Sequence, residues 1–368
     1  MPKMARAELG ASAAFAPDGT LYAVTKQGEH LMLYRSSNEG VSWSAPIVIN
    51  EQPEAIAADG ENRPKLAFAR DGALMVSWTR PLAKLYSGEI RFARSDDGRH
   101  FSLPLTVHRD RDEITHRFES MLVAGDGRVL LAWIDKRDGE AAKAGKIAYR
   151  GAAIYAAMST DGGRSFQPEQ KLADHSCECC RLAAANDADG TPFFMWRHVF
   201  TPNERDHAIV RVPSDGRPEA LQRATFDRWK IDGCPHHGPS LAVDAAGRRH
   251  AVWFNQKNGE GRVFYGQLGT GAAEATVEGQ RTVGGVRAEH ADLAVAGRRV
   301  AVLWKEFDGE RAHLWAEVSE DGGLSFRAAV ELASSAGASD QPRALSHGDA
   351  LYAFWRTERE GMRVFRLP

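Results

Sequence analysis

Residues 65–78 read KLAFARDGALMVSW, and this stretch decides the fold. Its apolar run KLAFA leads to an Asp-Gly pair that ends at Gly72, and the run LMVSW then ends at Trp78. Two short apolar runs joined by an Asp-Gly turn are typical of a β-hairpin. The stretch therefore predicts two antiparallel strands with a tryptophan in the second.

The same pattern recurs seven times along the 368 residues. Its turns are marked by glycines spaced 50–63 residues apart, namely Gly19, Gly72, Gly127, Gly190, Gly247, Gly297 and Gly348. Six copies place a tryptophan six or seven residues after the glycine: Trp78, Trp133, Trp196, Trp253, Trp304 and Trp355. The first copy has Thr25 at this position. We expect the tryptophans to pack between neighbouring sheets.

A repeat of this length, with no helical pattern between the hairpins, predicts an all-β radial array. We predict a β-propeller of seven four-stranded blades, with six as the alternative count, in a single domain over residues 1–368. The copies are expected at about 10–50, 62–107, 116–172, 180–223, 237–283, 289–333 and 340–368. The last copy lacks a fourth strand, which we expect residues 1–9 to supply by pairing with the strand at 361–367.

A second motif, S-x-D-x-G-x-[ST]-[WF], lies after the hairpin in several copies. Residues 159–166 (STDGGRSF) and 319–326 (SEDGGLSF) match it fully, and residues 36–43 match it with Asn38 in the aspartate position. A degenerate copy at 94–101 keeps Asp96, Gly98 and Phe101.

This motif is the Asp-box, and through it the chain resembles the sialidase-like propellers with Asp-box (BNR) repeats. In such a turn the carboxylate accepts backbone N–H bonds and glycine takes the positive-φ position. The box is therefore expected to be structural. Sialidases of known type have six blades, so the seven copies depart from that pattern.

Strand order separates two faces of the predicted ring. The glycine turns and the Asp-box turns share one face, and the other connections form the opposite face around the channel mouth, which we call the top. Polar, titratable or metal-ligating residues stand just ahead of the innermost strands there: Asn62-Arg63, His116-Arg117, Cys179-Cys180-Arg181, His236-His237, Glu289-His290 and Asp340-Gln341. We expect the functional site on this face.

The four cysteines of the chain cluster on two adjacent connections at the top: Cys177, Cys179, Cys180 and Cys234. Together with His236 and His237 they offer thiolate and imidazole ligands, which select copper(I) or zinc. His116 and His290, on flanking blades, are further candidate ligands; the alternative for each is an ordinary hydrogen-bonded surface histidine. Two disulfides that join the fourth and fifth blades are the alternative, as in an exported protein.

The arginines at the top suggest an anion site. Arg63, Arg117 and Arg181 are expected near the axis, and the arginine fork holds a carboxylate well. The resemblance to sialidases implies an arginine triad for a sugar carboxylate, with Asp59 as the candidate acid. The Phe-Arg-Ile-Pro motif of that family is missing, and no tyrosine is marked as its nucleophile. Ion pairs across the channel are the alternative role for these arginines.

Bulk composition excludes several classes of function. The net charge is −2 at pH 7, which provides no basic surface for nucleic acid. No run approaches 18 apolar residues, so no membrane span is expected. The start, MPKMARAEL, lacks the apolar core of a secretory signal. Two locations stay open, the cytoplasm, or the periplasm or cell exterior after removal of a signal.

Three functions follow from these observations. The first is a soluble propeller whose top carries a copper or zinc site beside arginines that hold a small anionic or glycan ligand. The second is an exo-glycosidase of sialidase type with its cysteines in disulfides. The third is an interaction propeller without chemistry, which the ring of titratable residues argues against.

Overall fold

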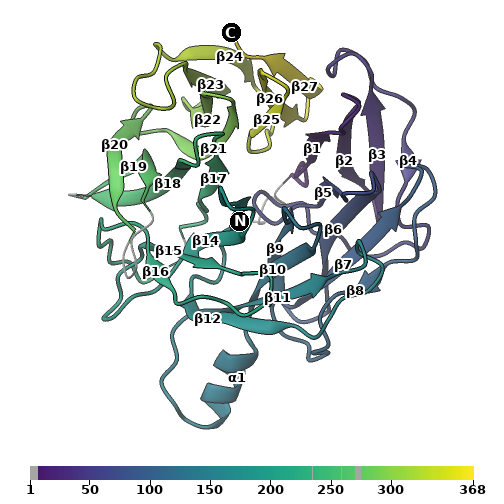
Figure 1. Ribbon diagram of the computed structural model, residues 1–368, viewed down its shortest axis with the longest axis vertical. Coiled ribbons are helices and arrows are strands. Elements are labelled where there is room, and N and C mark those ends of the chain that lie inside the picture. Colours follow the sequence, from purple (N-terminus) through teal and green to yellow (C-terminus); the bar gives the residue numbers. More distant parts are fainter. Residues whose placement is uncertain (1–6, 234, 258, 270–274) are drawn as a thin grey trace.

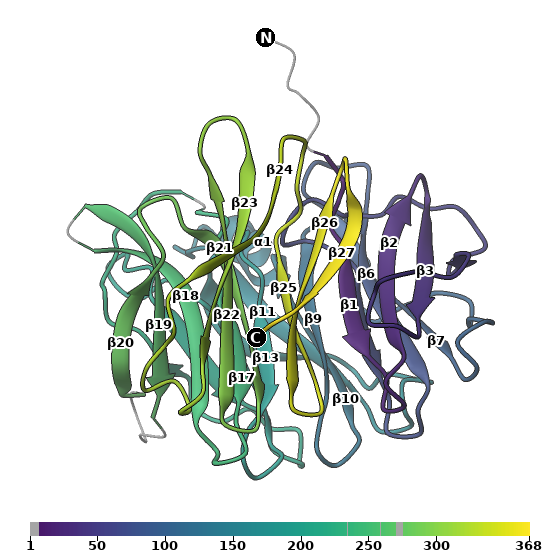
Figure 2. The same ribbon diagram turned by 90° about the horizontal axis from the view of Figure 1, so that it is seen from above.

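The computed structural model describes residues 7–233, 235–257, 259–269 and 275–368. Its strands form seven antiparallel sheets around a central axis (Figure 1), and Figure 2 shows the same ring from the side. The prediction of a seven-bladed, all-β propeller is confirmed. No helix of the described chain has the length and apolar character needed to cross a bilayer.

Each blade is built from strands that are consecutive in the sequence, with the first strand nearest the axis and the last at the periphery. The first three blades contain β1 (Ser12–Phe15), β2 (Leu21–Gln27), β3 (His30–Ser36), β4 (Ile47–Val48); β5 (Lys65–Phe68), β6 (Leu74–Pro81), β7 (Gly88–Ser95), β8 (Leu105–Thr106); β9 (His116–Val123), β10 (Val129–Asp135), β11 (Ala152–Ser159) and β12 (Gln170–Ser176). The next three contain β13 (Ala183–Asn186), β14 (Pro192–Arg197), β15 (His207–Arg211), β16 (Gln222–Arg223); β17 (Ser240–Val243), β18 (Arg249–Lys257), β19 (Glu260–Leu268), β20 (Val277–Val283); β21 (Glu289–Ala296), β22 (Arg299–Phe307), β23 (Ala312–Ser319) and β24 (Val330–Ser335). The seventh contains β25 (Arg343–His347), β26 (Ala350–Thr357) and β27 (Gly361–Arg366).

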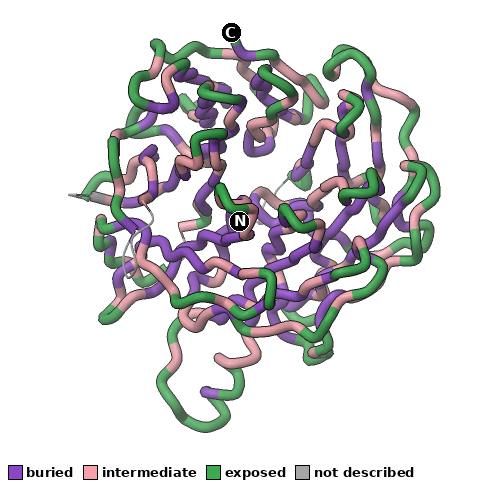
Figure 3. Tube along the Cα trace, viewed as in Figure 1, coloured by how far each residue is buried: buried purple, intermediate pink, exposed green. Residues whose placement is uncertain are grey.

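The hairpins form where the glycine turns predicted them. Phe68 pairs with Leu74 across the turn, and Gly72 has a φ of 85°, a conformation that glycine adopts without steric cost. The six repeated tryptophans are at most 1% exposed. Trp78 packs with Val24 and Leu31 of the first blade, so it fills the space between two sheets, as expected. Figure 3 shows the buried residues gathered along the strands and the exposed ones at the connections and periphery.

The Ser-x-Asp-x-Gly turns carry the hydrogen bonds expected of them. One carboxylate oxygen of Asp161 accepts the Ser159 hydroxyl (2.7 Å) and the backbone N–H of Ser165 (2.9 Å). In the degenerate copy, Asp97 takes this role and not Asp96, because Ser95 donates to Asp97. The assignment of Asp96 was therefore wrong by one residue.

The two kinds of turn lie on the same face, as predicted. Arg94 donates to Asp71, which stands in the glycine turn of its own blade, and to the carbonyl of Gly162 in the Ser-x-Asp-x-Gly turn of the next blade. The connections that enter each blade and those between its second and third strands are thereby left to the other face.

The predicted closure of the ring is not seen in the described residues. Residues 7–9 do not pair with β27, because Gly10 donates to the carbonyl of Ala58 and the Leu9 carbonyl accepts Arg356. These bonds hold the chain at the top of the channel. Residues 1–6 lie outside the described part of the chain.

One short helix was not predicted. It is α1 (Arg137–Ala144), in the connection from β10 to β11, and Figure 1 shows it projecting from the edge of the ring. Tyr155 of β11 donates to Asp138 of this helix, at 2.9 Å, so the helix is tied to its own blade.

Candidate functional site

Glu61 joins three connections at the top of the propeller. It precedes β5, is 5% exposed, and accepts the backbone N–H groups of Arg181 (2.9 Å) and Gly238 (2.8 Å), which precede β13 and β17. Burial alone would raise the pKa of Glu61, but the His290 imidazole and the Arg181 guanidinium hold this pKa well below its usual value. Glu61 is therefore ionised at neutral pH and fixes the connections that enter the second, fourth and fifth blades.

Gly238 permits a close approach between two of these connections. A Cβ atom at this position would lie 2.3 Å from Cγ of Arg181 and 2.6 Å from its carbonyl oxygen. Both distances are far inside van der Waals contact, so only glycine fits. The chain segments that carry the cysteines and the histidines are thus packed directly against each other.

Three cysteines converge in the connection between β12 and β13. The Sγ atom of Cys177 lies 4.0 Å from that of Cys179 and 3.9 Å from that of Cys180, and all three lie within 4.8 Å of one another. Each residue is at most 8% exposed. The structure thus brings together three of the four cysteines that the sequence analysis grouped. Cys234 lies outside the described residues.

The surroundings of the sulfur atoms are apolar on one side and cationic on the other. The cysteines belong to a core cluster with Phe118 and Trp196, and the Arg205 guanidinium lies 3.7 Å from Sγ of Cys177. The hydrogen bond from Cys180 to Cys177, together with burial, raises the pKa of the Cys180 thiol well above its usual value. Cys180 is therefore a protonated thiol at neutral pH.

The histidines do not all lie with the cysteines. Ligand atoms of His237, Glu289 and His290 form a second group within 4.8 Å of one another, separate from the sulfur group. The rings of His237 and His290 stack with centroids 4.3 Å apart, and Phe254 stacks on the other side of His237 at 4.2 Å. His236 is exposed at the surface.

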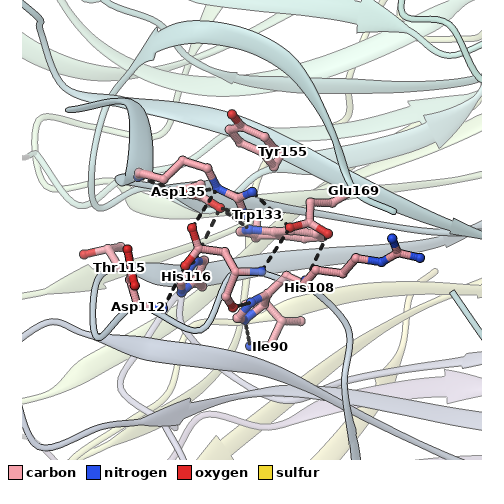
Figure 4. Close-up of polar contacts among 12 residues, drawn as sticks. Ile90, His108, Asp112, Thr115, His116, Trp133, Asp135, Tyr155 and Glu169 are labelled. Atoms are coloured by element: carbon pink, nitrogen blue, oxygen red, sulfur yellow. Dashed lines mark hydrogen bonds and ion pairs between the residues drawn. The ribbon is translucent and has the colours of Figure 1, made fainter. Parts of the chain in front are cut away.

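His116 belongs to a third environment, between the second and third blades (Figure 4). Its ring is fully buried, stacks on His108 at 3.9 Å, and hydrogen-bonds through Nδ1 to the carbonyl of Gly88. Its Nε2 lies 3.6 Å from both Asp110 and Asp135. Neither metal-ligand group contains His116, so its predicted place beside the cysteines is replaced by a role in packing two blades.

Two of the three predicted anion-binding arginines are used inside the protein. Arg63 is 2% exposed and forms a two-pronged ion pair with Asp340, at 2.8 Å for each prong. Arg181 donates to the carbonyls of Pro239 and Ala291 and lies 3.8 Å from Glu61. The alternative of ion pairs across the channel therefore holds for these two side chains.

Arg117 differs from the other two arginines. It makes only a long ion pair with Asp59, at 3.9 Å, and its guanidinium carbon lies 5.2 Å from the centre of the Phe118 ring and 5.9 Å from that of Tyr86. Tyr86 is 65% exposed. The Arg117 side chain itself is 14% exposed and that of Asp59 is 37% exposed, so Arg117 is the least enclosed by ion pairs of the three predicted arginines but only partly reaches the surface.

Lys65 and Glu119 are channel residues that the sequence did not mark. Burial and the charges of Arg63 and Arg343 lower the pKa of Lys65 to about 8, although Glu119 opposes the shift. Burial raises the pKa of Glu119, which accepts a hydrogen bond from Thr79 at 2.9 Å. Lys65 is the first residue of the run KLAFA, and a lysine at the start of an inner strand is the sequence feature that could have identified this position.

Comparisons with known proteins show the fold. No protein-family model matches the chain, and no curated protein matches it. Among solved structures it is similar to an ulvan lyase, a polysaccharide lyase, with a TM-score of 0.60 and 12% identity over 96% of this chain and 91% of that one. It is also similar to an α-L-arabinofuranosidase from Fusarium graminearum (TM-score 0.53, 13% identity, 84% and 92% covered). A sialidase from Streptococcus pneumoniae has a TM-score of 0.52 at 8% identity, with 83% and 67% covered.

Proposed function

We propose that this protein binds one soft metal ion, copper(I) or zinc, through the thiolates of Cys177, Cys179 and Cys180. The observation that carries the proposal is the convergence of three buried sulfur atoms within 4.8 Å at the top of the ring. Thiolates favour copper(I) and zinc over the hard cations magnesium and calcium. Three sulfur atoms suit copper(I), whereas a structural zinc site takes a fourth ligand. Cys234, whose placement is not described, is the candidate for that ligand.

The surroundings of the three cysteines indicate that a metal ion would bind with release of protons from the thiols. The Cys180 thiol is protonated at neutral pH, so an ion must displace its proton, and affinity should fall as the pH falls. The Arg205 guanidinium, 3.7 Å from Cys177, favours the thiolate form of that side chain. A buried site of this kind holds its ion firmly and excludes competing water ligands.

The test is a titration of the fully reduced protein with copper(I), in the presence of a competing chelator, and separately with zinc. We expect one equivalent per chain, lost in the double variant Cys177→Ser/Cys180→Ser, while far-UV circular dichroism shows that the fold persists. Thiol counting on the denatured, unreduced protein is the decisive control. If it finds no thiols, the cysteines are disulfides and the proposal fails.

A second candidate function, action on a glycan, is favoured by the partly exposed group of Arg117, Tyr86 and Asp59 at the rim. Together with this function we propose that the chain is a member of the sialidase-like superfamily, as the Asp-box motif suggests. The lyase, the arabinofuranosidase and the sialidase named above share the fold and support it, although Arg63 and Arg181 are not available for a sialidase triad. Asp59 and Arg117 together offer an acid and a cation within 3.9 Å of each other.

This candidate is tested by assaying the protein on ulvan, arabinan and a sialoside. Product release that is lost in Arg117→Ala and retained in Arg262→Ala, an arginine in the β18–β19 hairpin, would establish it. The absence of product from all three substrates would contradict it and leave the metal site unaffected.

A further inference from the structure

We infer that His237, Glu289 and His290 form a second metal site, open on one side and selective for zinc(II). This site is distinct from the proposed thiolate site and does not depend on it. One ligand atom from each of the three residues lies within 4.8 Å of the other two. Two imidazoles and a carboxylate are a ligand set that zinc accepts, and three protein ligands leave a fourth position for water or substrate.

The backbone aims His290 at this site by means of a β-bulge. At the start of β21, Glu289 pairs with Lys305 and Asp292 pairs with Leu303, so His290 and Ala291 both stand opposite Trp304. His290 has a φ of 51°, which is uncommon for a residue with a side chain. Bulges re-aim side chains next to functional sites, and backbone strain concentrates at such sites.

The same bulge occurs at Phe118 in the third blade, so the bulge alone does not mark a metal site. Phe118 stands at the matching position of the third blade, also opposite the repeated tryptophan, and has a φ of 59°. There the bulge places an apolar ring beside the cysteines. In the sixth blade the same backbone device carries a metal-ligating residue type, so the difference lies in the side chain.

One imidazole nitrogen at this site has unfilled hydrogen-bonding capacity. Nδ1 of His237 is buried and makes no hydrogen bond to a described residue, whereas Nδ1 of His290 faces Glu61. A buried polar atom without a partner costs free energy, which an ion would recover.

Glu61 provides the second ligand sphere. Its Oε1 lies 3.6 Å from Nδ1 of His290, which leaves Nε2 of His290 for the ion. Zinc-binding histidines commonly present their other nitrogen to a carboxylate, which orients the ring and strengthens the ligand. Lys305 lies 3.6 Å from Glu289 and is the competing cation that zinc must displace.

The stacked rings indicate which ligand moves. Stacked imidazoles direct their lone pairs side by side, so at least one ring must turn for both to reach one ion. His237 stacks on both Phe254 and His290, so turning His237 would break two ring contacts, whereas turning His290 would break one. We therefore expect His290 to rotate when zinc binds.

The experiment uses a full-length chain with all four cysteines replaced by serine, titrated with zinc(II) by calorimetry and with cobalt(II) by absorption spectroscopy. We expect one equivalent of each metal, and a cobalt spectrum of nitrogen and oxygen ligands without thiolate charge transfer. His290→Ala and Glu289→Gln should each weaken zinc binding at least tenfold. Glu61→Gln should weaken it about 10–100-fold, because Glu61 orients His290 and does not bind the ion.

The matched control is His313→Ala in the same blade. His313 also lies between two carboxylates, Glu331 at 3.0 Å and Asp308 at 2.9 Å, but both of its nitrogens have partners. This variant should bind zinc as its parent does. Loss of all binding in the cysteine-free chain, or full binding in His290→Ala, would overturn the inference.

If the cysteine-free chain does not fold, the cobalt titration is run on the reduced wild type. A second equivalent that adds absorption without thiolate charge transfer, and that is absent in His290→Ala, supports the inference. Saturation at one equivalent with thiolate charge transfer contradicts it and leaves the thiolate site standing.

Discussion

Arg63 and Asp340 form a buried, two-pronged ion pair although they are 277 residues apart in the chain. Asp340 also accepts the backbone N–H of Ala11 at 3.0 Å, so one carboxylate joins the first, second and seventh blades. The side chains are 3% and 1% exposed. This pair is a buried polar link across the point where the ring closes.

Breaking this pair should destabilise the protein strongly. Arg63→Ala leaves a buried carboxylate without its partner, which should lower the free energy of unfolding by about 3–5 kcal/mol. Arg262→Ala, which removes the exposed pair with Glu260, should cost at most about 1 kcal/mol. Chemical denaturation at pH 7 measures both. Equal effects would show that the closure does not depend on the pair.

The Ser-x-Asp turn of the second blade allows two adjacent aspartates, Asp96 and Asp97, to be compared by mutation. Asp97→Ala removes the acceptor for Ser95, Arg99 and His100, and should lower the melting temperature by several degrees. Asp96→Ala removes an exposed carboxylate that pairs with Arg94, and should change it little. Scanning calorimetry on the two variants distinguishes them, and the reverse order would restore the original assignment.

Glu169 should make stability depend on acid pH. Burial opposes ionisation of this carboxyl, but the backbone N–H of Arg109 and the Arg137 guanidinium lower its pKa to about 2. Because the folded pKa is below the ordinary value, the stabilisation is complete above about pH 5 and disappears as the pH falls towards 2. Glu169→Gln should cost about 1–3 kcal/mol at pH 7 and much less at pH 2.5. A difference that stays constant with pH would contradict this.

Gly238 should tolerate no side chain. Gly238→Ala forces Arg181 and its connection apart, which should destabilise the protein by roughly 1–3 kcal/mol. It should also weaken metal binding at both proposed sites, because Cys180 and His237 each adjoin a displaced residue. The control is Gly285→Ala, where the nearest atom to the new Cβ is 4.0 Å away. Unchanged stability in Gly238→Ala would mean that the connection rearranges freely.

The sequence predicted those parts of the structure that depend on residues close together in the chain. A glycine turn followed by Trp78 at a fixed distance specifies a hairpin and one contact between sheets, so seven copies specify the ring. Asp97 was missed because the degenerate motif offers two adjacent aspartates, and only the hydrogen bond from Ser95 separates them. The helix α1 interrupts one connection and has no counterpart in the repeat.

The location of the candidate site could be predicted from the sequence, but which of its residues contact one another could not. The residues ahead of each inner strand do gather at the top, because the connections that enter each blade lead there. Which of them meet is decided by contacts between distant blades, such as Glu61 with Arg181 and Gly238, and no spacing encodes these. The bulge that aims His290 is likewise a matter of register, since its sequence differs from that around Phe118.

The pair of Arg63 and Asp340 also bears on the order of folding. Within each blade the strands are consecutive, so their contacts form across short loops, whereas the pair must close a loop of 277 residues. Closing a long loop costs entropy that local hairpins do not, so long-range contacts form late. A contact that is absent from the transition state affects the unfolding rate and not the refolding rate. We therefore expect loss of the ion pair to speed the unfolding of a completed ring and to change its refolding rate little.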